Sequence, residues 1–207
     1  YLIKNNPPEE KGYEWKSFFK LSFYIVLPFI LVVKEPDLGT AMILALLGYG
    51  TLFVIGVHKK IWITLAIVVG ICSPIMYNSL HDYQKQRITD FISEKPSYHV
   101  KQSIIAIGSG GLTGKERSEA TQTHYKFLPI ATSDFIFAYT VERLGFWGAL
   151  GLIACYAFLV MHLLSLNFIL KEDYFARVIT SGISLLIFFY MSINIAMTIG
   201  LAPVVGV

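Results

Sequence analysis

Charged side chains are scarce in this sequence. Of its 207 residues, 15% are Asp, Glu, Lys or Arg and 55% are hydrophobic, whereas an ordinary soluble domain carries about 25% charged residues. The composition therefore excludes an ordinary soluble domain of this size. It predicts a membrane protein instead.

Cysteine is also rare, and its two occurrences, Cys72 and Cys155, both fall inside apolar runs. A disulfide framework or a cysteine-rich metal site therefore has no support, and small buried hydrophobic residues are the simpler interpretation. The five histidines lack the spacing of metal ligands. A secretory signal peptide is not expected, because residues 1–14 are polar and mixed in charge.

The sequence contains several long hydrophobic segments. Five runs of about 17 to 26 residues are long enough to cross roughly 30 Å of hydrocarbon at about 1.5 Å per residue. The predicted transmembrane helices are residues 17–33, 38–57, 61–77, 145–170 and 178–200. The predicted fold class is thus an all-α polytopic membrane protein, with residues 1–207 forming a single membrane domain.

The short loops predict how the helices are oriented. Lys and Arg residues are retained on the cytoplasmic side of short loops, and basic residues gather at residues 59–60 and 171–177. Both loops are therefore expected in the cytoplasm. Residues 34–37 and the large loop, residues 78–144, are then expected on the outer face, which is the periplasm in a Gram-negative cell.

The large outer loop is expected to carry the functional site. A loop this long in a compact bundle is usually functional or disordered, and this one is too apolar for disorder. Apolar residues recur at helical spacing within residues 88–92 and 100–107, which predicts two short amphipathic helices. These either lie on the membrane surface or pack over the ends of the transmembrane helices.

A glycine-rich stretch, residues 108–115 (GSGGLTGK), lies in this loop. It fails the P-loop pattern, because Ser109 stands where the first glycine belongs and Glu116 follows the lysine. A nucleotide site is therefore not predicted. The glycines still permit a tight backbone path that brings amides and Lys115 toward an anion, and a solvated charged loop is the simpler alternative.

Two acidic residues stand where outer segments meet apolar structure. Asp134 precedes the apolar residues 135–138, and Asp37 precedes the second predicted transmembrane helix. A carboxylate at such a boundary costs desolvation free energy unless it is paired or used. Helix capping is the structural alternative for both acids, and the residues alone favour it. A cation or substrate shared by the two carboxylates is the functional alternative.

Three stretches together resemble the SEDS family of shape, elongation, division and sporulation proteins. They are residues 35–41 (EPDLGTA), 102–112 (QSIIAIGSGGL) and 133–138 (SDFIFA). Part of the family's C-terminal signature is matched by Asn194, Gly200, Leu201, Pro203 and Gly206. The resemblance implies a ten-helix fold, of which this chain would be a fragment of the C-terminal half that supplies helices five to nine.

Shorter features refine the resemblance. Residues 121–123 and 127–129 are more similar to the family's elongation members than to its division members. Two positions depart from the family pattern: Ile130 stands where a glutamate is common, and Arg143 replaces the second acid of a pair, which leaves Glu142 alone.

The resemblance implies a peptidoglycan glycosyltransferase that polymerises lipid II during cell elongation, by inverting hexosyl transfer with release of undecaprenyl diphosphate. Asp134 matches the family's essential acid and would be the general base. The expected substrate contacts are Lys115, Gln102, Ser103, Gly110 and Gly111, with Lys115 as the cation for the diphosphate. Asp37 and Glu142 are expected in supporting or structural roles.

A divalent cation, Mg²⁺ or Mn²⁺, is compatible with diphosphate chemistry, and no organic cofactor is expected. The implied partner is a class B penicillin-binding protein with transpeptidase activity, in the bacterial inner membrane with the site facing the periplasm. No nucleic acid is expected. Two alternatives stay open: lipid II flipping or another transport function, which favours ionisable groups near the membrane midplane, and a non-catalytic scaffold, for which Asp134 is dispensable.

Overall fold

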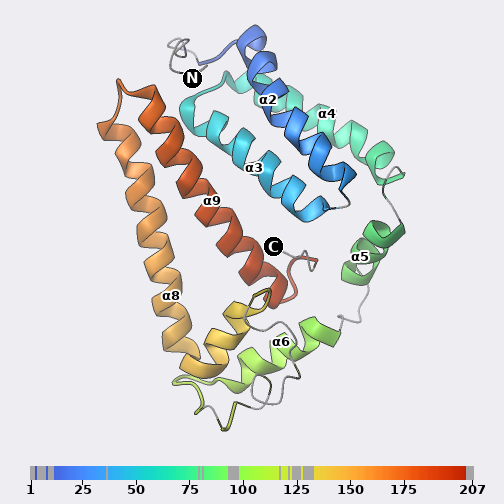
Figure 1. The fold of residues 1–207 in the computed structure, drawn as a ribbon, viewed down its shortest axis with the longest axis vertical. Coiled ribbons are helices and arrows are strands. Elements are labelled where there is room, and N and C mark those ends of the chain that lie inside the picture. Colours follow the sequence, from blue (N-terminus) through green and yellow to red (C-terminus); the bar gives the residue numbers. More distant parts are fainter. Residues whose placement is uncertain are drawn as a thin grey trace. The chain divides into compact units, whose positions relative to one another are not determined.

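The described part of the chain is almost entirely helical (Figure 1). The computed structural model describes residues 3, 8, 12–35, 37–78, 80, 82–92, 98–116, 118–120, 122, 127 and 133–203. Its helices are α2 (Trp15–Lys34), α3 (Leu38–Ile55), α4 (Lys59–Asn78), α5 (Asp82–Ile92), α6 (Tyr98–Ser109), α8 (Ile136–Ile169) and α9 (Tyr174–Thr198). Within these residues, the extended pairing is limited to one isolated bridge, between Tyr13 and Val57.

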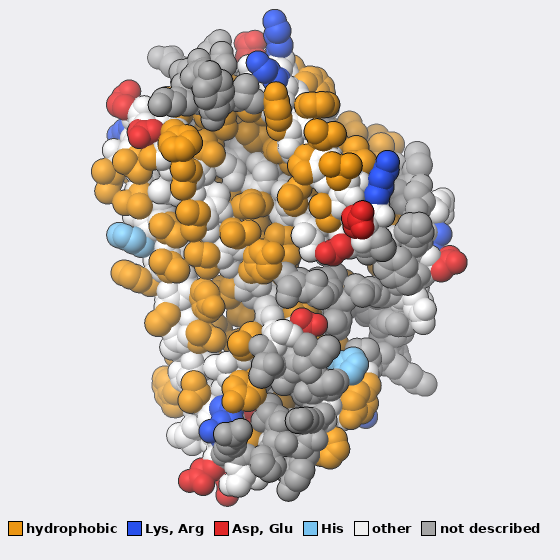
Figure 2. Space-filling model, viewed as in Figure 1, with side chains coloured by type: hydrophobic (Ala, Val, Ile, Leu, Met, Phe, Trp, Pro, Cys, Tyr) orange, Lys and Arg blue, Asp and Glu red, His pale blue; other side chains and the backbone are white. Residues whose placement is uncertain are grey.

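Helices α2, α8 and α9 are long and apolar enough to cross a membrane. Large hydrophobic side chains on them are exposed, including Phe19, Phe158 and Phe168, and Figure 2 shows hydrophobic side chains over much of one face. Contiguous apolar surface of this extent is unfavourable in water and is what lipid tails cover. The predicted fold class, an all-α polytopic membrane protein, is confirmed.

Helix α8 is too long for one straight crossing. Its 34 residues would extend about 51 Å at 1.5 Å per residue. Gly145 interrupts the helix with φ 69° and ψ −166°, so a short helix, residues 136–144, precedes the apolar helix of residues 146–169. The predicted fourth transmembrane helix began at this kink, at residue 145. Helices α3 and α4 coincide with the predicted second and third transmembrane helices, and their crossing of the membrane stays a prediction.

The chain divides into two compact units. Unit 1 comprises residues 1–81 and 159–189, and unit 2 comprises residues 82–158 and 190–207. Helices α8 and α9 each contribute residues to both units. The division leaves the predicted single membrane domain untested.

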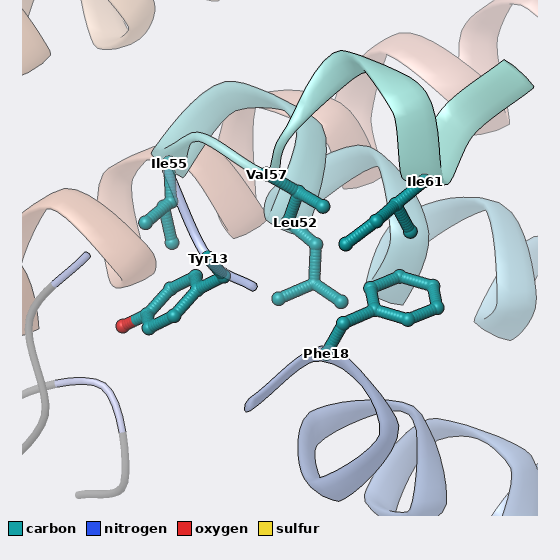
Figure 3. Packing of buried hydrophobic residues seen from close by; sticks show 6 residues of the cluster. All are labelled: Tyr13, Phe18, Leu52, Ile55, Val57 and Ile61. Carbon is teal, nitrogen blue, oxygen red and sulfur yellow. The ribbon is translucent and has the colours of Figure 1, made fainter. Parts of the chain in front are cut away.

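The core of unit 1 joins the segment before α2 to the turn between α3 and α4. The buried cluster consists of Tyr13, Phe18, Leu52, Ile55, Val57 and Ile61, whose side chains point toward one another (Figure 3). Two backbone hydrogen bonds reinforce it: the Tyr13 amide donates to the Gly56 carbonyl at 3.1 Å, and the His58 amide donates to the Tyr13 carbonyl at 3.3 Å. Burial, together with the nearby Tyr174, raises the pKa of the Tyr13 phenol to about 12.

Polar side chains join α8 and α9 within unit 1. The buried Ser184 hydroxyl donates to the Val160 carbonyl at 3.0 Å, and the Ser181 hydroxyl donates to Asn167 Oδ1 at 2.9 Å. An apolar helix surface packs about as well against lipid tails as against another helix. Small residues and interhelical hydrogen bonds of this kind therefore hold membrane helices together.

Unit 2 is organised around α6, the start of α8 and the end of α9. One buried cluster joins Ala106 of α6 to Phe135 and Ala138, and a second contains Phe137, Val141 and Ala149 of α8. Helix α6 buries Val100, Ser103 and Ala106, which recur every three residues along one face. The predicted short helices of the large loop are thus present as α5 and α6.

Candidate active site

Asp134 lies in the turn that leads into α8 and is half-buried. Its Oδ1 accepts a hydrogen bond from the Ser133 hydroxyl at the long distance of 3.4 Å. Within the described part of the chain, no helix amide donates to this carboxylate, because α8 begins two residues later, at Ile136. Capping, the structural alternative, therefore does not occupy the Asp134 carboxylate, which is available to another molecule.

The backbone around Asp134 is more firmly held than its side chain. Phe135 is 3% exposed and packs against Ala106 of α6 and Ala138 of α8. The side-chain amide of Asn194, on α9, donates from Nδ2 to the Asp134 carbonyl oxygen at 3.0 Å. The candidate base is thus anchored to α6 and α9 through its backbone.

Lys115 is clamped at both of its backbone polar groups. Its amide donates to the Glu142 carbonyl at 3.0 Å, and its own carbonyl accepts from Nη1 of Arg143 at 3.1 Å. Among the described residues its ammonium makes no ion pair, and the side chain is half-buried. Glu142 and Arg143 on α8 therefore fix the position of the Lys115 backbone. The Lys115 ammonium stays available to bind an anion.

Three glycines let the loop approach α8 this closely, and we call residues 110–115 with residues 141–147 the glycine clasp. A Cβ added at Gly110 would overlap the Val141 carbonyl, and one at Gly114 would overlap the Arg143 carbonyl. A Cβ at Gly145 would overlap the backbone of Leu112 and Gly114. Gly114 and Gly145 also have positive φ values of 83° and 69°, which L side chains rarely adopt.

The glycine clasp also caps the long apolar part of α8, residues 146–169. The kink at Gly145 leaves the next amides without helical partners, and the amides of Phe146 and Trp147 donate instead to the carbonyls of Gly111 (2.9 Å) and Leu112 (3.3 Å). This helix end is therefore already satisfied by loop carbonyls. In the loop itself, the amides of Gly110, Gly114 and Lys115 are also engaged.

The other predicted substrate contacts differ in accessibility. Ser103 is fully buried, and its hydroxyl donates to the Thr198 carbonyl at 2.8 Å, which points to a structural role. Gly110 is buried against α8, Gln102 is half-buried, and Gly111 is exposed. Substrate contacts by these residues stay predictions, and Gly111 is the most accessible of them.

The two supporting acids are both engaged. Glu142 is 0% exposed, and its Oε1 accepts a hydrogen bond from the Gln122 amide at 3.0 Å. Asp37 belongs to unit 1 and is the N-cap of α3, where its Oδ1 accepts from the Thr40 amide at 3.1 Å. A cation shared by Asp37 and Asp134 stays a prediction.

The donor set argues against a metal held by protein side chains alone. Among the described residues, no three His, Cys, Asp or Glu side chains come together, and the Glu142 carboxylate already accepts a backbone amide. The described residues therefore do not form a dedicated divalent-cation site.

Sequence reasoning did not pair Asn194 with Asp134 or Arg143 with Lys115. The sequence did contain a signal for each contact: Asn194 is a polar residue within an apolar helix, and Arg143 is a basic residue where the family pattern has an acid. Thr121, Thr123, Leu128, Pro129, Ile130 and Gly206, which entered the resemblance, lie outside the described residues.

Comparison with known proteins gives a consistent set of relatives. A family model described as cell cycle protein, FtsW/RodA/SpoVE, matches residues 1–207. The chain is 58% identical over all 207 residues to "Peptidoglycan glycosyltransferase MrdB" of Helicobacter pylori strain J99, covering 54% of that protein. It is 40% identical over 189 residues to the protein of the same name in Escherichia coli K12, which is 88% of this chain and 51% of that protein.

A more distant relative is "Peptidoglycan glycosyltransferase RodA" of Treponema pallidum, which is 32% identical over 180 residues, or 83% of this chain and 41% of that protein. The chain thus spans about half the length of the curated relatives that it matches.

Proposed function

Because the chain belongs to the FtsW/RodA/SpoVE family over its whole length, we propose that the full-length protein is a peptidoglycan glycosyltransferase that polymerises lipid II during cell elongation. The observation that carries this proposal is the 58% identity, over all 207 residues, to a protein named peptidoglycan glycosyltransferase MrdB. The accessible Asp134 carboxylate in the large loop supports it, since glycosyl transfer to a hydroxyl needs a group that removes a proton.

In the proposed reaction, Asp134 is the general base. Its carboxylate takes the proton from the acceptor sugar hydroxyl while that oxygen forms a bond to the anomeric carbon of the lipid-linked donor. The bond from the anomeric carbon to the diphosphate oxygen breaks, the configuration inverts, and undecaprenyl diphosphate leaves. A diphosphate departs as a stable anion, so this reaction needs one carboxylate rather than the two of most glycoside hydrolases.

Lys115 is the proposed cation for the leaving diphosphate. Negative charge grows on the diphosphate as the bond breaks, and a positioned ammonium stabilises that charge more in the transition state than in the ground state. The backbone clamp from Glu142 and Arg143 supports this role, because it fixes the base of a flexible side chain. The exposed Gly111 next to this loop is a proposed backbone contact for the same group.

The setting of the reaction is part of the proposal. The active site faces the periplasm from the inner membrane, where lipid II carries its sugars after export, and the proposed partner is a class B penicillin-binding protein with transpeptidase activity. Mg²⁺ or Mn²⁺ bound to the substrate diphosphate is the proposed cofactor. Its requirement is decided by measuring polymerisation before and after EDTA treatment, with each metal added back.

The decisive experiment is lipid II polymerisation by the full-length protein and its transpeptidase partner, with Asp134→Asn and Asp134→Ala beside wild type. Both variants are expected to lose glycan product by about 10²- to 10⁴-fold, the usual contribution of a general base. Asp173→Asn is a matched control, because Asp173 accepts from the Phe175 and Ala176 amides at the start of α9 and lies in unit 1. It is expected to polymerise like wild type.

Retained polymerisation by folded Asp134→Ala would remove the general base from the proposal. Lipid II flipping, measured in vesicles with the same variants, then separates the transport alternative from the scaffold alternative. A scaffold leaves both polymerisation and flipping to other proteins and is expected to retain only the association with the partner.

A further inference from the structure

Asn194 places a polar side chain near the C-terminal end of the apolar helix α9. Its Nδ2 donates to the carbonyl oxygen of Asp134, 60 residues earlier in the sequence, at 3.0 Å. A polar side chain within a membrane helix costs free energy unless it finds a partner, and interhelical partners of this kind fix how helices meet. The partner here belongs to the proposed catalytic residue.

The carbonyl that Asn194 binds lies just outside helix α8. Helix α8 begins at Ile136, so the carbonyl of Asp134 precedes the helix and takes no part in its regular bonding. The neighbouring bonds do form: the Ile136 amide donates to the Ser133 carbonyl at 3.4 Å, and the Tyr139 amide donates to the Phe135 carbonyl at 3.1 Å. Asn194 therefore supplies a hydrogen bond, at Asp134 itself, to a carbonyl that the helix does not use.

The direction of the Asp134 carboxylate depends mainly on the position of its backbone. The contact of the Asp134 side chain with Ser133 is long, at 3.4 Å, so it restrains the carboxylate weakly. On one side the backbone is fixed by the buried Phe135, and at the Asp134 carbonyl it is fixed by Asn194. Removal of either anchor would let the carboxylate shift relative to a bound acceptor sugar.

We infer that Asn194 is a positioning residue for the base in the proposed glycosyl transfer, an inference that rests on the proposed function of Asp134. Asn194 takes no proton and contacts the backbone of Asp134, so it acts on the position of the carboxylate and not on its protonation. A displacement of about 1 Å at a reacting group costs up to about 100-fold in rate. Loss of the Nδ2 donor therefore lowers kcat and leaves the KM for lipid II near its wild-type value.

The test compares three variants of Asn194 in the full-length protein with its partner. Asn194→Leu keeps the approximate size and removes the donor, Asn194→Asp keeps the shape and replaces the donor by an oxygen, and Asn194→Gln keeps an amide donor one methylene further out. The Leu and Asp variants are expected to lose about 10- to 100-fold in kcat. The Gln variant is expected to be faster than both.

Two further readouts separate positioning from a folding defect. The first readout is kcat per lipid II-binding site, which excludes unfolded protein from the count of active sites. The second readout is the solvent deuterium isotope effect on kcat. A displaced base makes proton transfer more rate-limiting, so the isotope effect is expected to increase, whereas a loss of folded protein leaves it unchanged. Asn167→Leu is the matched control, because it removes another asparagine that joins α8 to α9, in unit 1, and is expected to retain the wild-type kcat per site.

Wild-type kcat in the Leu and Asp variants, with Asp134→Ala inactive, overturns the positioning role and leaves the proposed function standing. Activity of Asp134→Ala overturns the proposed function itself, whatever the Asn194 variants do. Where Asn194→Leu does not fold, the comparison of Asn194→Gln with Asn194→Asp decides: a faster Gln variant supports the role of the amide donor, and equal kcat values overturn it.

Discussion

The three acidic side chains that the sequence analysis singled out differ in what their oxygens accept. Asp37 accepts the Thr40 amide at the start of α3, and the fully buried Glu142 accepts the Gln122 amide. Among the described residues, the Asp134 carboxylate accepts a hydrogen bond only from the neighbouring Ser133 hydroxyl, at 3.4 Å. A carboxylate that already accepts backbone amides is poorly suited to collect a proton from a substrate, so the geometry favours Asp134 among the three.

Arg143 gives a prediction about the proposed diphosphate contact. Its guanidinium donates to the Lys115 carbonyl, so Arg143→Met is expected to free one side of the clamp and to lower kcat/KM about 5- to 20-fold, through a less restrained Lys115. Arg143→Lys keeps the charge but has a single, more flexible donor group, so it is expected to recover little of this loss. Lipid II polymerisation at several substrate concentrations measures the effect.

Lys101→Met is the control for the loss of positive charge in this loop, because Lys101 is an exposed cation on α6. An equal loss of activity in Lys101→Met and Arg143→Met would assign the effect to overall charge. It would contradict a specific role for the contact between Arg143 and Lys115.

At the scale of single elements, the glycine clasp is held by close backbone contact. Gly114 has φ 83°, and an added Cβ there would overlap the Arg143 carbonyl, whereas Gly108 lies in α6 with open space around its missing Cβ. Gly114→Ala is therefore expected to destabilise the protein by about 1–3 kcal/mol or more, the usual cost of a strained backbone. Gly108→Ala is expected to be neutral or to stabilise by about 0.4–1 kcal/mol.

Thermal unfolding of the detergent-solubilised full-length protein measures both changes. A melting temperature of Gly114→Ala equal to that of Gly108→Ala would show that the loop does not press against α8 as described. The same pair separates stability from chemistry, because Gly108→Ala is expected to polymerise lipid II at the wild-type rate.

Sequence patterns predicted the helices of the large loop better than their packing. The stretch around residues 100–107 is helical as predicted, but α6 buries Val100, Ser103 and Ala106 while Ile104 is 45% exposed. Small residues face inward because they allow α6 to approach α8 and α9, and the Thr198 carbonyl gives the Ser103 hydroxyl a partner. Neither cause is visible in the local sequence, so the burial of Ser103 could not be predicted from it.

At the scale of the whole molecule, the fold class followed from hydrophobicity because lipid leaves few choices. A membrane-spanning segment must satisfy its own backbone hydrogen bonds, so long apolar runs form helices, as α2, α8 and α9 do. The candidate site depends instead on contacts between distant residues, such as Asn194 with Asp134 and Gln122 with Glu142. Such contacts form only after the helices pack, and local patterns do not encode them.

Orientation in the membrane is the last property that the sequence predicts, and it decides whether the proposed site reaches exported lipid II. The basic loops at residues 59–60 and 171–177 predict that their side is cytoplasmic, and the glycine clasp is then expected to face the periplasm. In full-length protein whose native cysteines are replaced, Thr113→Cys is expected to react with a membrane-impermeant maleimide in cells with a permeable outer membrane. Lys60→Cys and Glu172→Cys are expected to react only after the inner membrane is opened.

All three positions are exposed, so a difference in labelling reports the side of the membrane and not burial. If Lys60→Cys and Glu172→Cys react in intact cells while Thr113→Cys is protected, the orientation of the protein is the opposite of the predicted one. The proposed site would then face the cytoplasm, where the growing glycan strand is absent, and polymerisation by Asp134 would be impossible whatever its geometry.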